Sequence, residues 1–148
     1  MENKLKKIFY SYSHKDKTHR ENMEKHLTIL RQSNLISEWS DKEILAGQHI
    51  NNTILDALNS SDIIIFLISI DFLASPACIY EWNTAKELVK NNDKKIICII
   101  LRECPWTDFD DMKDYLALPY DGKPITSWDS IDSAWNNVYG EIKKVVRS

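Results

Sequence analysis

The sequence predicts an α/β domain built on a doubly wound parallel sheet with helices on both faces. Residues 63–68 and 96–101 are continuously apolar, which is typical of strands that are buried on both faces. Strand-like and helix-like segments alternate along the whole chain. This alternation predicts a parallel sheet, in which ligands bind beyond the carboxyl ends of the strands.

The first strand is predicted at residues 6–11. A polar cluster follows it and contains two candidate helix caps, Ser13 and Asp16. The helix after this cluster should end near residues 33–34, and its apolar face is formed by Met23, Leu27 and Leu30.

A short second strand is predicted at residues 35–39. The loop at 40–48 follows, with Gly47 as its one conformationally permissive residue. The next helix leads into the buried strand at 63–68, and its apolar stripe is formed by Ile50, Ile54, Leu55 and Leu58.

A helix begins after this strand at Ser75-Pro76, a hydroxyl suited to the cap followed by proline at the first helical position. Glu81 falls on the edge of its apolar arc, which is formed by Cys78, Trp82, Ala85, Leu88 and Val89. A carboxylate at a buried margin has either an ion-pair partner or a task. From the residues alone, both readings stay open.

The last third of the chain begins with a strand at residues 95–101. Residues 102–123 are rich in acidic and aromatic side chains and predict an ordered loop with short helical turns. Residues 124–126 predict a short edge strand, and a final helix carries the apolar stripe Ile131, Trp135, Val138, Ile142 and Val145.

Size and composition describe one ordinary domain, which we expect to span residues 1–148. The net charge of −3 leaves no basic excess for nucleic acid, and no stretch has the length of a signal peptide or a membrane span. We therefore expect a cytoplasmic protein that binds neither nucleic acid nor membrane.

The cysteines and glycines narrow the chemistry further. Three cysteines without Cys-x-x-Cys or Cys/His spacing predict neither disulfides nor zinc, and Cys98 is expected in the core. Three single glycines form no phosphate-binding loop. We expect no metal and no resident cofactor, so a nucleotide must be held in another way.

Three segments meet at the carboxyl edge of the predicted sheet: residues 11–16, the loop at 40–48, and the approach to Glu81 through Ser75 and Cys78. They form the candidate pocket.

Several kinds of site are disfavoured there. A phospho-receiver would use Asp71, but it needs an acidic pair where this chain has Ser11 to Ser13. Cys78 lies in the first turn of a helix, where a thiol pKa is lowered, yet no histidine is evidently placed to serve it. No GxSxG motif supports a serine hydrolase, and His19 and His26 are expected to be structural.

A single carboxylate can act on one type of glycosidic bond. Ordinary glycosidases also need an acid, because the departing alcohol must be protonated. Nicotinamide leaves NAD as a neutral molecule from a cationic ring, so no acid is required. A glutamate that faces the oxocarbenium-like transition state can supply the electrostatic stabilisation.

The chain resembles the bacterial TIR (Toll/interleukin-1 receptor) domain family over nearly its whole length. The resemblance rests on the spacing of Ser75, Cys78 and Glu81 and on separate segments: FYSYSHKD at 9–16, ISEWSDKEILAGQ at 36–48, DIIIFLIS with DFLAS at 62–75, LRECPW at 101–106 and LALPYDGKPITSW at 116–128. It implies a flavodoxin-like fold with five parallel strands.

The resemblance also implies an activity. Many such TIR domains cleave NAD to nicotinamide and ADP-ribose or a cyclic isomer, in prokaryotic defence or signalling, with a helix glutamate that aligns with Glu81. Active forms usually self-associate through a loop that aligns with residues 40–48, beside a sensor domain that would lie outside this chain. The substrate-binding residues implied by the alignment are Ser11, Tyr12, Trp39, Asp41 and Gly47, joined by Ser75 and Cys78 on the approach to Glu81.

One position departs from the family pattern. Members that cleave NAD often carry an aromatic residue four before the glutamate, where this chain has Ala77. Trp39, Trp82 or Tyr12 could only partly replace its stacking on a base. Some TIR domains are interaction modules without turnover, and that alternative stays open.

Overall fold

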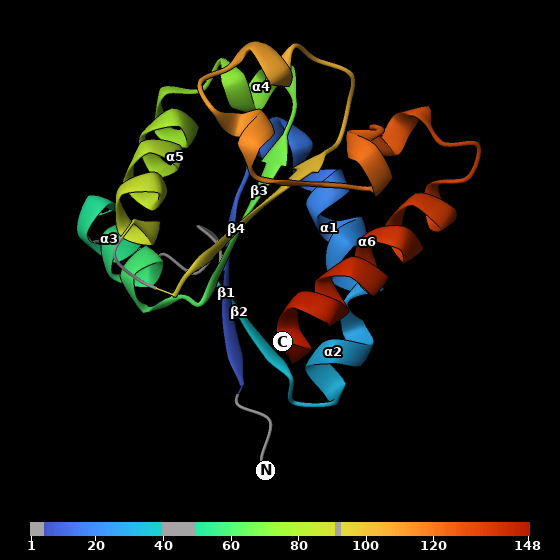
Figure 1. Ribbon diagram of the computed structural model, residues 1–148, viewed down its shortest axis with the longest axis horizontal. Coiled ribbons are helices and arrows are strands. Elements are labelled where there is room, and N and C mark those ends of the chain that lie inside the picture. The colour runs from blue at the N-terminus through green and yellow to red at the C-terminus, as the bar shows by residue number, and fades with distance from the viewer. Residues whose placement is uncertain (1–4, 40–49, 91–92) are drawn as a thin grey trace.

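The computed structural model describes residues 5–39, 50–90 and 93–148, and its centre is a five-stranded parallel sheet (Figure 1). The order across the sheet is β2-β1-β3-β4-β5, and each neighbouring pair is parallel. The strands are β1 Lys6–Ser11, β2 Ile36–Trp39, β3 Ile63–Ile68, β4 Lys95–Ile100 and β5 Leu116–Leu118. The predicted doubly wound sheet is confirmed.

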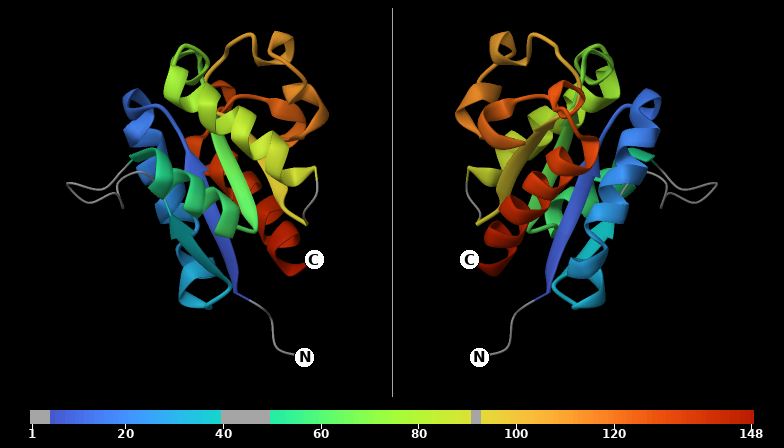
Figure 2. Two further views of the ribbon diagram at one scale, coloured as in Figure 1. Left: turned by 90° about the vertical axis from the view of Figure 1, so that its left-hand side faces the viewer. Right: turned by 90° about the vertical axis from the view of Figure 1, so that its right-hand side faces the viewer.

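Helices cover both faces of the sheet (Figure 2). One face carries α1 Lys17–His26, α2 Thr28–Gln32 and α6 Ile131–Arg147, and the other carries α3 Ile50–Ser60 and α5 Pro76–Val89. The short helix α4 Ile70–Leu73 lies at the carboxyl end of β3. We call the two sides the α1/α6 layer and the α3/α5 layer.

The strands divide the core between these layers. In β1, Ile8 and Tyr10 pack in the α1/α6 layer and Phe9 packs in the α3/α5 layer, because successive side chains of a strand point to opposite faces. Every residue of β3 is buried, as expected for the central strand of a sheet covered on both sides. Each such side chain contributes about 1.5–3 kcal/mol by leaving water.

The first predicted helix is divided in two. Leu27 leaves helical geometry with φ −94° and ψ 6°, between α1 and α2. The hydroxyl of Thr28 donates to the Lys25 carbonyl at 2.7 Å and so bonds a backbone group where α1 ends. The second helix ends at Gln32 with Ser33 as its C-cap, close to the predicted end, and Asn34 turns the chain into β2 with a left-handed φ of 57°.

The fifth strand is not where the sequence predicts it. Residues 124–126 are predicted as an edge strand, but Ile125–Ser127 forms a 3-10 turn in which Ile125 is buried in the α1/α6 layer. The Thr126 N–H donates to the Leu101 carbonyl at 3.2 Å, so this segment closes over the end of β4. The edge strand is β5, which pairs with β4 from inside the segment predicted as a loop.

The rest of that segment matches its prediction. It is ordered by three 3-10 turns, Trp106–Asp108, Met112–Asp114 and Tyr120–Gly122.

Candidate functional site

The helix α5 begins as its sequence predicts and carries Glu81 on its inner side. Ser75 is the N-cap, and its hydroxyl oxygen accepts a hydrogen bond from the Cys78 N–H at 3.2 Å. Pro76 occupies the first turn, where its missing N–H costs nothing. Glu81 is 9% exposed and shares the buried side of the helix with Cys78, Trp82 and Ala85.

Ser11, the last residue of β1, points into the same layer as Glu81. It alternates with Tyr10 and lies beside Phe66 of β3, whose ring packs against Trp82 at 5.1 Å between centroids. The side chain is 1% exposed, and among the described residues its Oγ has no hydrogen-bond partner. A buried hydroxyl left unpaired costs about 1–3 kcal/mol, and this hydroxyl can exchange a hydrogen bond with a polar group that comes close to it.

Trp39 ends β2 on the same side of the sheet. Its ring stacks on Phe9 with centroids 5.0 Å apart and an interplanar angle of 13°. The preceding residue, Glu38, faces the other layer, where it accepts hydrogen bonds from the Tyr10 hydroxyl and from Arg31 Nη1, the latter at 2.8 Å. Burial and the Glu38 carboxylate raise the pKa of Tyr10 well above 10.0. These contacts hold Trp39 in place.

The other predicted residues have different surroundings. The Tyr12 ring is buried in the α1/α6 layer, with the Arg20 guanidinium 5.2 Å above its centroid. Ser75 and Cys78 form the hydrogen bond that caps the start of α5. Asp41 and Gly47 lie outside the described residues. The structure therefore brings Glu81, Ser11 and Trp39 into one layer and turns the Tyr12 ring into the other.

A charged network at the carboxyl edge was not predicted. Asp16, 1% exposed, accepts hydrogen bonds from Arg102 Nη2 at 2.9 Å and Nε at 3.2 Å, and from the Ser69 hydroxyl. Arg102 Nη2 also donates to Asp71 at 2.6 Å. Hydrogen bonds from Arg102 to Asp71 and then to Asp16 raise the Arg102 pKa, against the opposing effect of burial.

This network ties together the segments that follow β1, β3 and β4. The sequence suggests Asp16 only as a helix cap, whereas Ser13 caps the 3-10 turn His14–Asp16 through the Lys15 N–H. The position of Arg102 in the sequence could have indicated this network. Arg102 directly follows a predicted buried strand, and functional side chains of parallel sheets collect after the carboxyl ends of the strands.

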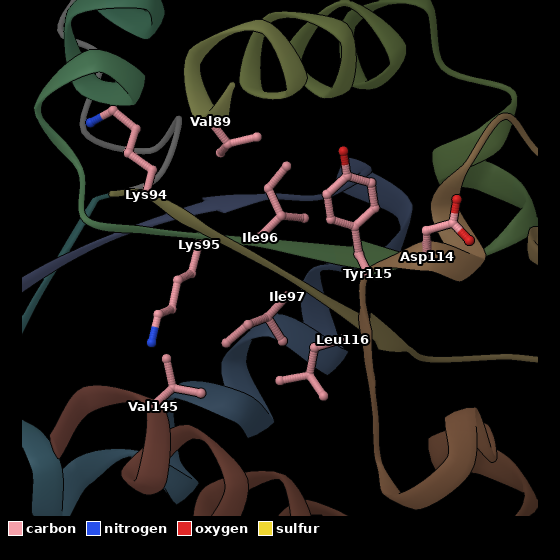
Figure 3. Close-up of a pocket in the computed structure, with 9 residues that line it drawn as sticks. All are labelled: Val89, Lys94, Lys95, Ile96, Ile97, Asp114, Tyr115, Leu116 and Val145. Atoms are coloured by element: carbon pink, nitrogen blue, oxygen red, sulfur yellow. The ribbon is translucent and has the colours of Figure 1, made fainter. Parts of the chain in front are cut away.

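The structure also has a hollow far from this edge. It measures about 400 Å³ and opens at the amino ends of β4 and β5, where Val89 of α5 and Val145 of α6 approach from opposite faces (Figure 3). Ligands of parallel α/β sheets bind at the carboxyl ends, so we do not include this hollow in the candidate site.

Within 5–39, 50–90 and 93–148, no three His, Cys, Asp or Glu side chains gather closely enough to hold a metal ion. Across the same ranges, no helix combines the length and apolar character that crossing a membrane requires.

Solved structures with the same fold come from several sources. The TIR domain of the Toll-related receptor TRR-2 from Hydra magnipapillata is 18% identical with a TM-score of 0.61, over 92% of this chain and 97% of that one. A prokaryotic SEFIR domain is 17% identical with a TM-score of 0.61, over 97% and 93%. The TIR domains of the activated Roq1 resistosome, which recognises the pathogen effector XopQ, are 19% identical with a TM-score of 0.57, over 69% and 61%.

Sequence comparison is more specific than these likenesses of fold. The protein y4lF of Sinorhizobium fredii, named as uncharacterized, is 39% identical over 140 residues, which are 93% of this chain and 42% of the relative. The chain thus spans about two fifths of that protein. The family model of the TIR domain matches residues 8–135. The chain belongs to the TIR domain family.

Proposed function

We propose that this chain cleaves NAD at the bond between nicotinamide and ribose, with Glu81 as the catalytic residue. The observation that carries the proposal is the burial of Glu81 in the same layer as the Ser11 hydroxyl, which has no hydrogen-bond partner among the described residues, beside the carboxyl edge of the sheet. A carboxylate in a water-poor site interacts strongly with positive charge that develops nearby. The buried hydroxyl adds a hydrogen-bonding group for a polar substrate.

The reaction needs one carboxylate. The C–N bond breaks, its electron pair leaves with nicotinamide, and the ribose carries the positive charge. Glu81 stabilises that charge in the transition state. Water then adds to the ribose carbon and loses a proton to give ADP-ribose, or a nitrogen of the molecule's own adenine adds to give a cyclic isomer.

The wider setting belongs to the same proposal. The chain acts in the cytoplasm in prokaryotic defence or signalling, and self-association through the 40–48 loop activates it under the control of a sensor. The likeness to TIR domains of an assembled resistosome supports the self-association.

The second candidate is an interaction module without turnover, and Ala77 favours it. This residue is exposed one helical turn before Glu81, so no aromatic ring is available there. Trp82 is buried in the core and the Tyr12 ring lies in the other layer. Stacking of a base therefore depends on Trp39.

The test of the enzyme is nicotinamide release from NAD by concentrated protein, compared between wild type and Glu81→Gln. We expect Glu81→Gln to lower kcat by a few powers of ten, on the scale of about 3 kcal/mol or more. Glu87→Gln, on the exposed side of the same helix, is the matched control and should keep full activity.

Two results would contradict the proposal. Wild type that releases no nicotinamide at any concentration at which it self-associates favours the interaction module. Equal release from wild type and Glu81→Gln removes the role given to Glu81.

A further inference from the structure

The segment after β4 contacts one edge of α5, the helix that carries Glu81 (Figure 2). Trp82 donates its indole Nε1–H to Asp110 Oδ2 at 3.0 Å. One turn later, Lys86 pairs with the same Asp110 oxygen and lies 2.8 Å from Asp111 Oδ1. Asp110 and Asp111 are thus bound to two side chains on one side of α5.

Helix geometry places Glu81 on the other edge of the buried stripe. With about 100° per residue, Trp82 and Lys86 lie on one side of the line through Cys78 and Ala85, and Glu81 lies on the other. The Trp82 edge packs against Phe109 and Tyr115, with ring centroids 6.1 and 5.4 Å away. The Glu81 edge therefore faces the side of α3 and β1.

The turn that holds Asp110 is firmly built. Asp110 has a left-handed φ of 49°, and the Met112 N–H donates to the Phe109 carbonyl at 3.1 Å across the turn. Met112 is fully buried and anchors the turn to the core. The hydrogen bonds from Lys86 and then from Trp82 lower the pKa of Asp110, so it stays ionised and keeps accepting both.

We propose that Asp110 is a positioning residue: through Trp82 it sets the rotation of α5 about its axis and so the location of the Glu81 carboxylate. The inference rests on the proposed function of Glu81. A carboxylate about 6 Å from the helix axis moves about 1 Å when the helix rotates by about 10°. A displacement of that size at a reacting centre can cost as much as a hundredfold in rate.

Four variants separate positioning from general stability. Asp110→Gly keeps the left-handed backbone and removes the acceptor, whereas Asp110→Asn keeps both the backbone and an oxygen for the indole N–H. Asp121→Gly is the matched control, because Asp121 is another exposed aspartate with a left-handed φ, here 58°, in the distant turn Tyr120–Gly122. Val138→Ala, in the α1/α6 layer, controls for lost stability alone.

The closing experiment measures kcat and KM for nicotinamide release well below the unfolding temperature of every variant. Asp110→Gly should lower kcat about tenfold or more with little change in KM, and Asp110→Asn should restore it. Asp121→Gly and Val138→Ala should match wild type. An unchanged kcat in Asp110→Gly, or an equal loss in Val138→Ala, overturns the inference.

A second readout does not depend on turnover. The ¹³C chemical shift of the Glu81 carboxyl should change in Asp110→Gly and return toward the wild-type value in Asp110→Asn. If wild type releases no nicotinamide, the proposed function fails and this shift alone decides whether Asp110 positions Glu81. An identical Glu81 shift in wild type and Asp110→Gly then overturns the inference.

Discussion

Ser11 and Ser69 are both buried at the carboxyl edge, but their hydroxyl groups differ in hydrogen bonding. The Ser69 hydroxyl donates to Asp16, and its oxygen accepts from the Phe72 N–H at 3.2 Å. The Ser11 hydroxyl has no partner among the described residues. A paired hydroxyl stabilises the fold, whereas an unpaired one is retained at a cost that binding can offset.

We expect Ser11→Ala to leave the free energy of unfolding unchanged or slightly raised, because no hydrogen bond to any of the described residues is lost. If Ser11 binds the substrate, KM for NAD should rise about three- to tenfold, which corresponds to one hydrogen bond. Ser69→Ala is the contrasting variant and should cost about 1–3 kcal/mol of stability, since it removes a donor from a buried carboxylate. A Ser11→Ala variant with unchanged KM would exclude Ser11 from binding.

His19 makes stability depend on pH. Burial lowers its pKa from the ordinary value of 6.5, and Arg102 adds to this while Asp16 opposes it. The unfolded chain therefore binds more protons than the folded chain between the folded pKa and about 6.5. The free energy of unfolding should fall as pH decreases through that window. Below the folded pKa, His19 is protonated in both states and should cause no further fall.

His19→Gln should remove this part of the pH dependence. The measurement is urea unfolding of wild type and variant at a series of pH values from neutral to mildly acidic. Parallel curves over the whole series would show that His19 does not contribute.

At the scale of elements, the Ser75 side chain caps the start of α5. Ser75→Ala should lower the free energy of unfolding by about 0.5–2 kcal/mol, because the Cys78 N–H loses its acceptor. Ser75→Asp should keep most of the stability, since aspartate caps equally well. Denaturant unfolding measures both, and wild-type stability in Ser75→Ala would contradict the assignment. A raised KM in a stable Ser75→Asp variant would instead favour contact with the substrate.

At the carboxyl edge of the sheet, side-chain hydrogen bonds connect the segments that follow β1, β3 and β4. Arg102 joins Asp16, after β1, to Asp71, after β3. Arg102 donates two hydrogen bonds to Asp16, and the Ser69 hydroxyl adds a third. Because Ser11 and Tyr12 lie just before this anchored turn, the network restrains the loop that the candidate site shares with β1.

Over the whole molecule, a single sheet separates two cores, one in each layer. The α1/α6 layer contains an apolar core that includes Trp135, Val138 and Ile142, with Glu38 hydrogen-bonded to Tyr10 at its edge. The α3/α5 layer contains Phe9, Phe66 and Trp82 and also receives Ser11 and Glu81. The polar groups of the candidate site therefore lie on one side, above the central strands.

The sequence by itself determined the sheet class, the start of α5 and the position of Glu81 at a buried margin. Each depends on short-range rules: continuous apolar runs, a serine-proline cap and a helical period of 3.6 residues. The break at Leu27 had no such signal, since a helical pattern continues through it.

The tertiary structure alone decided which residues meet. Residues 116–118 became the edge strand because β4 offered a pairing edge there, and Ile125 was drawn into the core. Asp16 and Arg102 are 86 positions apart and meet only because parallel strands end at one edge. The resemblance implies that Ser11 and Tyr12 both line the substrate pocket; the Tyr12 ring packs under Arg20 in the other layer, because successive side chains at the end of β1 point to opposite layers.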